Sequence, residues 1–224
     1  MNKKLLIWAA AALLTACDKK LELANPNYPT TATYWQNAAQ ADAGTVAIYN
    51  ALALEGTYTR SFPGLSDSRG DDVQGNSPWS DLVLVGRFTI PSNSAPVEWI
   101  WRDHFIIVNR ANQVLTQVPA IDAAQFTEGH KNRVLGQAYF LRAFAYFNLI
   151  NTFQKVPLIT EPPKGKDEYY PATVDPEDVW KQIIEDLKEI GIEVNEVMAP
   201  LEKRFLPYIL GRGVPPPNNA TFRW

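Results

Sequence analysis

Apolar residues recur at helical spacing through the middle of the chain. The clearest run is residues 131–151, in which one face is formed by Val134, Ala138, Leu141, Ala145 and Leu149. A second apolar flank beside it contains Tyr139, Phe140, Phe144 and Phe147. A surface helix needs only one apolar stripe, so a helix with two predicts neighbours on both sides. We therefore expect this helix to lie at the centre of a helical domain.

Three more helices are predicted by the same spacing and by their end signals. The first covers roughly residues 37–54 and ends at Gly56, and the second runs from Val97 to Pro119. Thr127 is a candidate N-cap for the central helix. The last helix begins after Asp175, with a proline at its first position, and stops at Gly191. The pattern as a whole predicts a mainly α fold.

Residues 57–96 differ from the helical segments on either side. Glycine and proline are frequent there, and helical spacing is weak. Hydrogen-bonding side chains cluster in its first half and are followed by Trp79; the cluster comprises Asp67, Arg69, Asp71, Asp72, Gln74 and Asn76. An irregular segment of this length is usually disordered or functional, and its aromatic and polar residues favour function. We expect an irregular insert that carries a binding site.

The N-terminus has the pattern of an export signal. Lys3 and Lys4 precede an apolar run of about ten residues, which is shorter than the roughly twenty that cross a bilayer. The run ends in Leu-Thr-Ala before Cys17, a pattern typical of a bacterial lipobox. Cys17 is the single cysteine of the chain, so it cannot form an internal disulfide. We predict a signal peptide over residues 1–16, lipidation at Cys17, and a polar tether over residues 17–33.

Composition and motifs exclude several classes of function. With 46% hydrophobic and 20% charged residues, most of the chain should fold. The net charge of −3 (−5 once Lys3 and Lys4 are removed) includes no basic run, so nucleic acid is not an expected partner. The sequence has no nucleophile elbow, phosphate-binding loop, dinucleotide fingerprint or zinc-ligand spacing. We expect no catalysis, no metal and no cofactor, with His104 and His130 in structural or surface roles.

The central helix carries a recognisable signature. Residues 136–149 read GQAYFLRAFAYFNL and are followed by Val156-Pro157-Leu158. This resembles the helix "AxxLRAxxYFxL" and the loop "GGVPL" of SusD-like (RagB/SusD) outer-membrane lipoproteins. Residues 101–112, 68–73 and 175–187 resemble further motifs of that family in the same order, and the lipobox agrees. The resemblance covers roughly residues 17–189.

The sequence departs from the family pattern in two places. Gln154 and Lys155 stand where the family has two glycines, so that turn should differ. Family members are about twice as long, and their next helix pair is missing after Glu189, although Gly211-Arg212 echoes its first letters. Residues 192–224 form an irregular, Pro-rich tail that fits a truncated or frame-shifted copy.

The resemblance implies a fold and a role. The fold consists of tetratricopeptide-like helical hairpins with long irregular insertions, here a helical domain over residues 34–191 with its insert at about 57–96. The role is that of a surface lipoprotein of the outer membrane. The resemblance implies that such a lipoprotein captures oligosaccharides and delivers them to a SusC-like TonB-dependent transporter.

A sugar site needs exposed rings for stacking and a few polar side chains. We predict Trp79 as the stacking platform, Asn76 and Asp72 as hydroxyl partners, and Arg69 as a further contact; the alternative for Trp79 is a buried anchor of its loop. Trp99, Trp101 and Trp180 are expected in the core. Tyr169-Tyr170 fits either a partner surface or a second ligand contact.

Four other functions remain open at this point. A peptide-binding member of the same family would keep the scaffold and change the ligand. A tetratricopeptide-like adaptor would bind a protein on its helices. An enzyme would need a carboxylate pair, for which Asp71-Asp72 is a poor candidate because adjacent side chains usually point apart. A truncated copy without function is the fourth.

Overall fold

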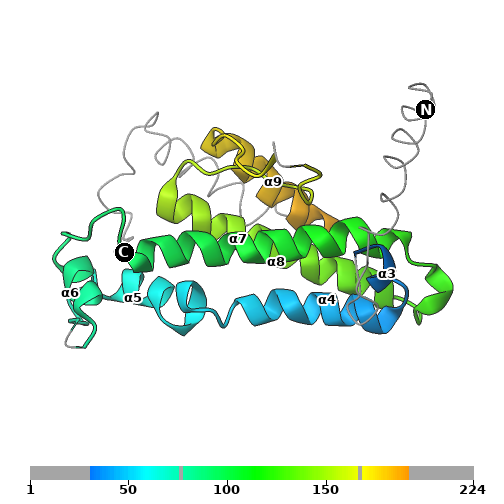
Figure 1. Ribbon diagram of the computed structural model, residues 1–224, viewed down its shortest axis with the longest axis horizontal. Coiled ribbons are helices and arrows are strands. Elements are labelled where there is room, and N and C mark those ends of the chain that lie inside the picture. Colours follow the sequence, from blue (N-terminus) through cyan, green and yellow to red (C-terminus); the bar gives the residue numbers. More distant parts are fainter. Residues whose placement is uncertain (1–30, 76–77, 166–167, 192–224) are drawn as a thin grey trace, which may run out of the picture. The chain divides into compact units, whose positions relative to one another are not determined.

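The computed structural model describes residues 31–75, 78–165 and 168–191, and these are mainly α-helical (Figure 1). Within them no strand forms, and an isolated antiparallel bridge joins Pro157 to Thr173. The predicted fold class is confirmed. The predicted signal peptide, Cys17, Asn76 and the tail 192–224 lie outside the described residues.

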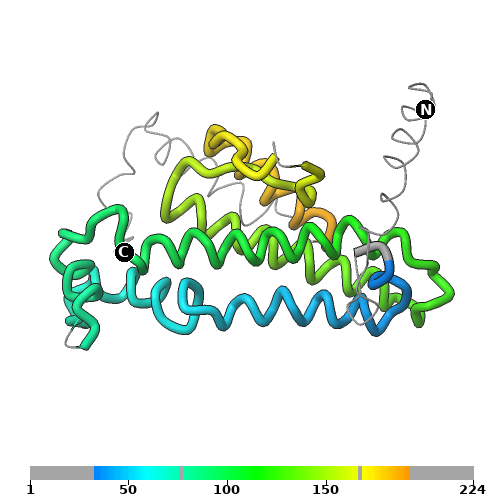
Figure 2. The backbone as a smooth tube through the Cα atoms, in the orientation of Figure 1, coloured from blue at the N-terminus to red at the C-terminus, as the bar shows by residue number. Residues whose placement is uncertain are grey.

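Four helices form the body of residues 37–191. They are α4 (Ala38–Ala51), α7 (Ala95–Gln117), α8 (His130–Phe153) and α9 (Pro176–Glu189). α8 packs against α7, α9 and α4, and α7 also packs against α4 (Figure 2). The prediction that the central helix has neighbours on more than one side is therefore confirmed. The short helix α3 (Thr31–Tyr34) belongs to a separate unit, residues 1–36, in which the rings of Tyr34 and Trp35 meet edge to face.

The core lies where these four helices meet. It is aliphatic, with one buried tyrosine, and its largest members are Ile48, Ile100, Ile107, Leu141, Tyr146, Leu149 and Ile150. Small residues such as Ala111, Ala138 and Ala145 are fully buried beside them. Alternating large and small side chains lets helices approach closely, as the predicted pattern required.

The helix ends follow local chemistry, with small departures from the predicted ends. Asn37 caps α4 by accepting a hydrogen bond from the N–H of Gln40. α9 begins at Pro176, as predicted, after an extended Asp175. Thr127 is not the cap of α8: Gly129 takes that place with φ of 70°, a conformation that glycine adopts without strain.

The predicted irregular insert is more regular than expected. A π-helical turn (Glu55–Thr59) and the short helices α5 (Ser61–Asp67) and α6 (Ser80–Gly86) lie within or beside it. Gly56 does not simply end α4. Its backbone approaches α7 so closely that a Cβ there would overlap the carbonyl oxygen of Trp99, and its N–H donates to the buried carboxylate of Asp103 at 2.8 Å. This contact holds the start of the insert against α7.

The second apolar flank of α8 is less covered than predicted. Phe144 is half-buried and stacks on Tyr58, with 5.7 Å between ring centroids. Phe140 stacks on Phe144 but is 45% exposed, and Phe147, edge to face with Trp180, is 41% exposed. The flank does have neighbours, Tyr58 against Phe144 and Trp180 against Phe147, but they leave Phe140 and Phe147 partly open to solvent.

Candidate functional site

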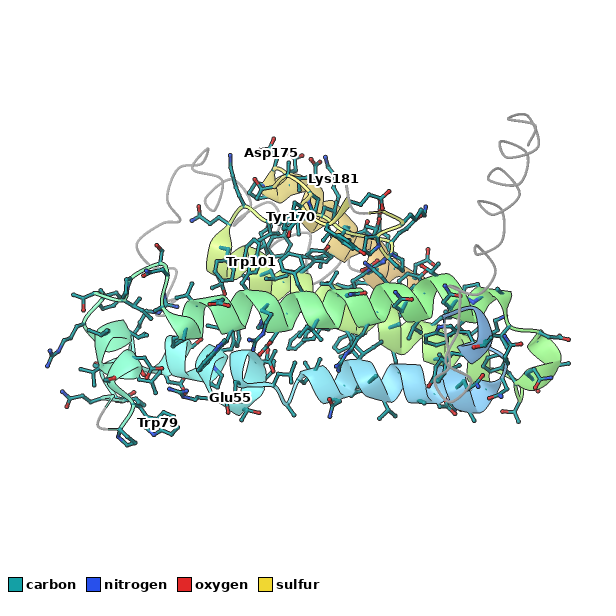
Figure 3. The ribbon with its side chains drawn as sticks, in the orientation of Figure 1. Glu55, Trp79, Trp101, Tyr170, Asp175 and Lys181 are labelled. Atoms are coloured by element: carbon teal, nitrogen blue, oxygen red, sulfur yellow. The ribbon has the colours of Figure 1, made fainter. Side chains whose placement is uncertain are left out.

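Trp79 precedes α6 at one end of the helical body, where its side chain points away from the helices (Figure 3). The indole is 47% exposed, so the alternative of a buried loop anchor is wrong. Arg60 lies 4.0 Å from the ring centroid, and its Nη2 donates to the Asp81 carboxylate at 2.6 Å. A guanidinium held by a carboxylate and packed on an aromatic face is a stabilising cation–π contact. Arg60 therefore braces Trp79 in a half-exposed position.

Of the other predicted site residues, the structure describes Arg69 and Asp72, and no contact of either with the Trp79 ring is seen. The Nε of Arg69 donates to the Leu65 carbonyl at 2.9 Å, within one turn of the chain, and Asp72 is exposed. Their neighbours surround a separate hollow of about 250 Å³, lined by Ser68, Gly70, Asp71, Val73, Gln74, Gly75, Val83, Gly86 and Arg87. Neither Trp79 nor Arg69 nor Asp72 lines that hollow. The insert does form a polar depression, but with different side chains from those predicted.

A larger hollow of about 450 Å³ lies between α7 and the loop that follows α8. Its lining is mainly aromatic and prolyl with a few polar groups: Trp101, Phe105, Val108, Asn109, Asn112, Pro157, Ile159, Glu161, Pro163, Glu168, Tyr169, Tyr170 and Pro171. Trp101, expected in the core, is only partly buried and reaches this hollow. Tyr169 and Tyr170 at its rim are 59% and 93% exposed. Figure 3 places Tyr170 and Trp101 on the opposite side of α8 from Trp79.

A buried polar network fixes the loop that forms one wall of this hollow. Arg142 of α8 donates from Nε and Nη2 to the two carboxylate oxygens of Asp186 on α9, at 2.8 and 2.6 Å. Its Nη1 donates to the Asn112 side chain and to the Thr160 carbonyl, and the Asn112 amide donates to the Ile159 carbonyl. A two-pronged Arg–carboxylate pair with its remaining groups bonded is the arrangement that a buried charge requires. One arginine thus joins three helices and the loop.

Tyr146 adds a second clamp on the same loop. Its hydroxyl donates to the Ile159 carbonyl at 2.9 Å and accepts from the Ile159 N–H at 2.7 Å. Burial raises the pKa of Tyr146 to about 12, so the hydroxyl is neutral and can serve both bonds. Arg142 and Tyr146 belong to the sequence signature "LRAxxYF", and their positions give that signature a structural role.

The remaining polar groups indicate structural roles. His104 is fully buried, donates from Nδ1 to the Ile100 carbonyl, and has its pKa lowered, mainly by burial. His130 contacts Asp42 at 2.8 Å. Among the described residues there is no group of three or more His, Cys, Asp or Glu side chains suited to a metal ion. No described helix has the length and apolar character needed to cross a membrane.

Comparison with known proteins gives one consistent family. Residues 32–194 match SusD-like_3, described as "Starch-binding associating with outer membrane". A "SusD-like protein" of Bacteroides ovatus is 29% identical over 189 residues, which is 84% of this chain and 34% of the relative. The chain spans about a third of the length of the curated relatives that it matches.

Solved structures agree with the sequence comparison. A laminarin-binding SusD-like protein is 30% identical with a TM-score of 0.56, covering 69% of this chain and 34% of that one. A structure with a xylogluco-oligosaccharide is 26% identical with a TM-score of 0.57, covering 67% and 29%. The helical body described above is therefore similar to proteins whose names mention laminarin and a xylogluco-oligosaccharide.

Proposed function

The chain belongs to the SusD-like family, and on that premise we propose that it binds oligosaccharides at the cell surface and passes them, without catalysis, to a TonB-dependent outer-membrane transporter. Two structural relatives whose names mention laminarin and a xylogluco-oligosaccharide support glycan as the ligand class. The transporter partner follows from the family resemblance of the sequence.

Trp79 is the single observation that carries glycan capture in this chain. Its ring is about half exposed to solvent and is held in place by Arg60. A sugar that stacks on it would therefore cost little side-chain conformational entropy. Sugars present C–H faces that pack on aromatic rings, and hydroxyls that bond to nearby polar groups. Asp72 is exposed in the same insert and is available as a hydroxyl partner. Asn76 and Arg69 stay in the proposal as flanking contacts.

Calorimetric titration tests this proposal directly. The full chain is titrated with laminari-oligosaccharides and xyloglucan oligosaccharides, and Trp79→Ala is compared with Tyr49→Ala, which removes an exposed ring from α4. We expect Trp79→Ala to weaken binding about tenfold, a loss of about 1.4 kcal/mol, with Tyr49→Ala unchanged. Binding of extended peptides in place of glycans would favour the peptide-capturing alternative. Full retention of glycan affinity in Trp79→Ala would remove this ring from the site.

The membrane anchor is a separate part of the proposal. We propose that Cys17 is acylated after removal of residues 1–16, and that residues 17–33 tether the domain to the outer membrane. Cys17→Ser in a host with a lipoprotein pathway should abolish incorporation of labelled palmitate and shift the protein from the membrane to the soluble fraction. Unchanged labelling of the serine variant would contradict lipidation at this residue.

A further inference from the structure

The hollow between α7 and residues 157–171 has features that the proposed Trp79 site lacks. It is concave, with a volume of about 450 Å³ that suits one to a few sugar rings, and its lining combines Trp101 with Tyr169 and Tyr170. Tyr170 is 93% exposed, which is unusual for a tyrosine in a folded domain. An exposed ring at the rim of an aromatic hollow is available to a ligand without any rearrangement of the core.

The wall of this hollow is held in place before any ligand arrives. Ile159 is fixed by Tyr146 and Asn112, and the next carbonyl, that of Thr160, accepts from Arg142. The backbone N–H of Val174 donates to the carbonyl of Val156 at 3.0 Å and closes the base of the loop. A preformed site loses less conformational entropy on binding than a loop that must fold around its ligand.

The charged side chains at the hollow are mainly acidic. Glu161 and Glu168 line it, and no described lysine or arginine does. Lys164 bonds to one oxygen of each carboxylate, through Nζ to Glu161 and through its backbone N–H to Glu168. The second oxygen of each carboxylate has no recorded partner among the described residues and can accept from a sugar hydroxyl. The Lys164 ammonium offsets the charge of Glu161, and the described side chains at the hollow keep the net negative charge of Glu168, so a uronate would add a like charge there, which is unfavourable.

We propose that this hollow is a second carbohydrate site, distinct from Trp79, that binds neutral oligosaccharides and rejects acidic ones. The proposal rests on glycan capture as the proposed function and adds to it a place and a charge selectivity. Trp101 forms the floor, Tyr169 and Tyr170 stack on the sugar at the rim, and the two glutamates and Asn109 accept or donate hydrogen bonds. Trp79 does not line this hollow and lies on the other side of α8 from Tyr170 (Figure 3), so the two sites belong to different surfaces.

The test uses laminarihexaose as the neutral probe and hexagalacturonate as the acidic one, titrated calorimetrically into the full chain. The double variant Tyr169→Ala/Tyr170→Ala is made alone and in the Trp79→Ala background, with Tyr49→Ala as the control for loss of an exposed ring. Both rim tyrosines are exposed, so their removal should leave the fold intact, which circular dichroism checks. We expect the double variant to weaken laminarihexaose binding at this site about tenfold. The residual binding of Trp79→Ala should disappear in the combined variant.

Charge selectivity is tested by Glu161→Gln/Glu168→Gln. We expect wild type to bind hexagalacturonate at least about tenfold more weakly than laminarihexaose. The difference between the two affinities should be smaller in the Glu161→Gln/Glu168→Gln variant. Equal affinity for both probes in wild type would overturn the charge argument. If binding depends on Trp79 alone and not on the rim tyrosines, the second site is absent while the proposed function stands. If neither probe binds and the xyloglucan oligosaccharides do not bind either, the proposed function and this inference are both wrong.

Discussion

Arg142 and Asp186 face each other across the α8–α9 contact with both side chains buried and two hydrogen bonds between them. The pair lies next to the loop whose carbonyl at Thr160 the same arginine also holds. Arg142, the arginine of the sequence signature in α8, is therefore a buried structural residue that connects the helices to the loop.

Removing one charge of this pair should lower the stability of the fold. Asp186→Asn leaves a buried guanidinium with an uncompensated charge, and we expect a loss of about 3–5 kcal/mol in the free energy of unfolding. The apolar double variant Arg142→Met/Asp186→Leu removes both charges and should lose less than Asp186→Asn alone. Urea unfolding of the three proteins measures this order. A double variant less stable than Asp186→Asn would contradict the account.

Substitution of Gly56 should also destabilise the fold. A Cβ at this position meets the backbone of Trp99 and the Asp103 carboxylate, so Gly56→Ala forces α7 and the π-helical turn apart. We expect a loss of about 1–3 kcal/mol or more, as for an overpacked core. Gly165→Ala is the matched control because, apart from Gly165 and its chain neighbours, no described atom lies within 4 Å of the added Cβ. Thermal unfolding should separate the two variants clearly.

His104 should make the fold sensitive to mild acid. Its Nδ1 bonds to the Ile100 carbonyl, while the buried Nε2 has no hydrogen-bond partner among the described residues, so a second proton would be unsatisfied in the core. Burial lowers the pKa of His104 in the folded state below its ordinary value near 6.5. The unfolded chain then binds more protons, so stability is full above pH 6.5 and falls as the pH drops below it.

One such histidine changes the free energy of unfolding by at most about 1.4 kcal/mol per pH unit. Urea unfolding between pH 7.5 and 5 measures it in wild type and in His104→Gln, which keeps a side-chain donor but does not titrate. The variant should show the shallower dependence. Parallel curves for the two proteins would mean that His104 does not control acid stability.

Removal of Arg60 should loosen Trp79 without removing the ring. Arg60→Gln deletes the cation over the indole and the bond to Asp81, so we expect a red-shifted, more solvent-quenched tryptophan emission and glycan affinity reduced about threefold, or about 0.7 kcal/mol. Arg133→Gln, on the exposed side of α8, removes the same charge elsewhere. An effect of equal size in that control would attribute the loss to net charge.

The long helices could be predicted from the sequence because three or more turns of apolar spacing determine a buried face. α5 and α6 could not, because helices of seven residues contain too few turns for a periodic signal, and Pro63 and Gly64 lie inside the first of them. α5 is held by contacts with the π-helical turn and α7, and α6 packs against α5; only the folded chain provides these contacts.

The candidate sites were also harder to predict, because they depend on contacts between residues that are distant in the sequence. Trp79 was identified as an exposed ring, but its brace comes from Arg60, nineteen residues earlier, and from Asp81. The hollow beside α7 needs the loop after α8 to fold back by way of Arg142 and Tyr146. One signal for it was present: an arginine between Leu141 and Ala143, on a helix whose neighbouring positions are apolar, must find partners inside the fold.

The open row of rings on α8 has a practical consequence for work with the purified protein. Tyr58, Phe144 and Phe140 form a continuous hydrophobic band that is partly exposed to solvent. Exposed apolar patches of this kind promote self-association as the protein concentration rises. Phe140→Lys would place a charge at the exposed end of that band and should keep the chain monodisperse in light scattering. Sugar titrations run on that background would report on the rim tyrosines and Trp79 free of self-association.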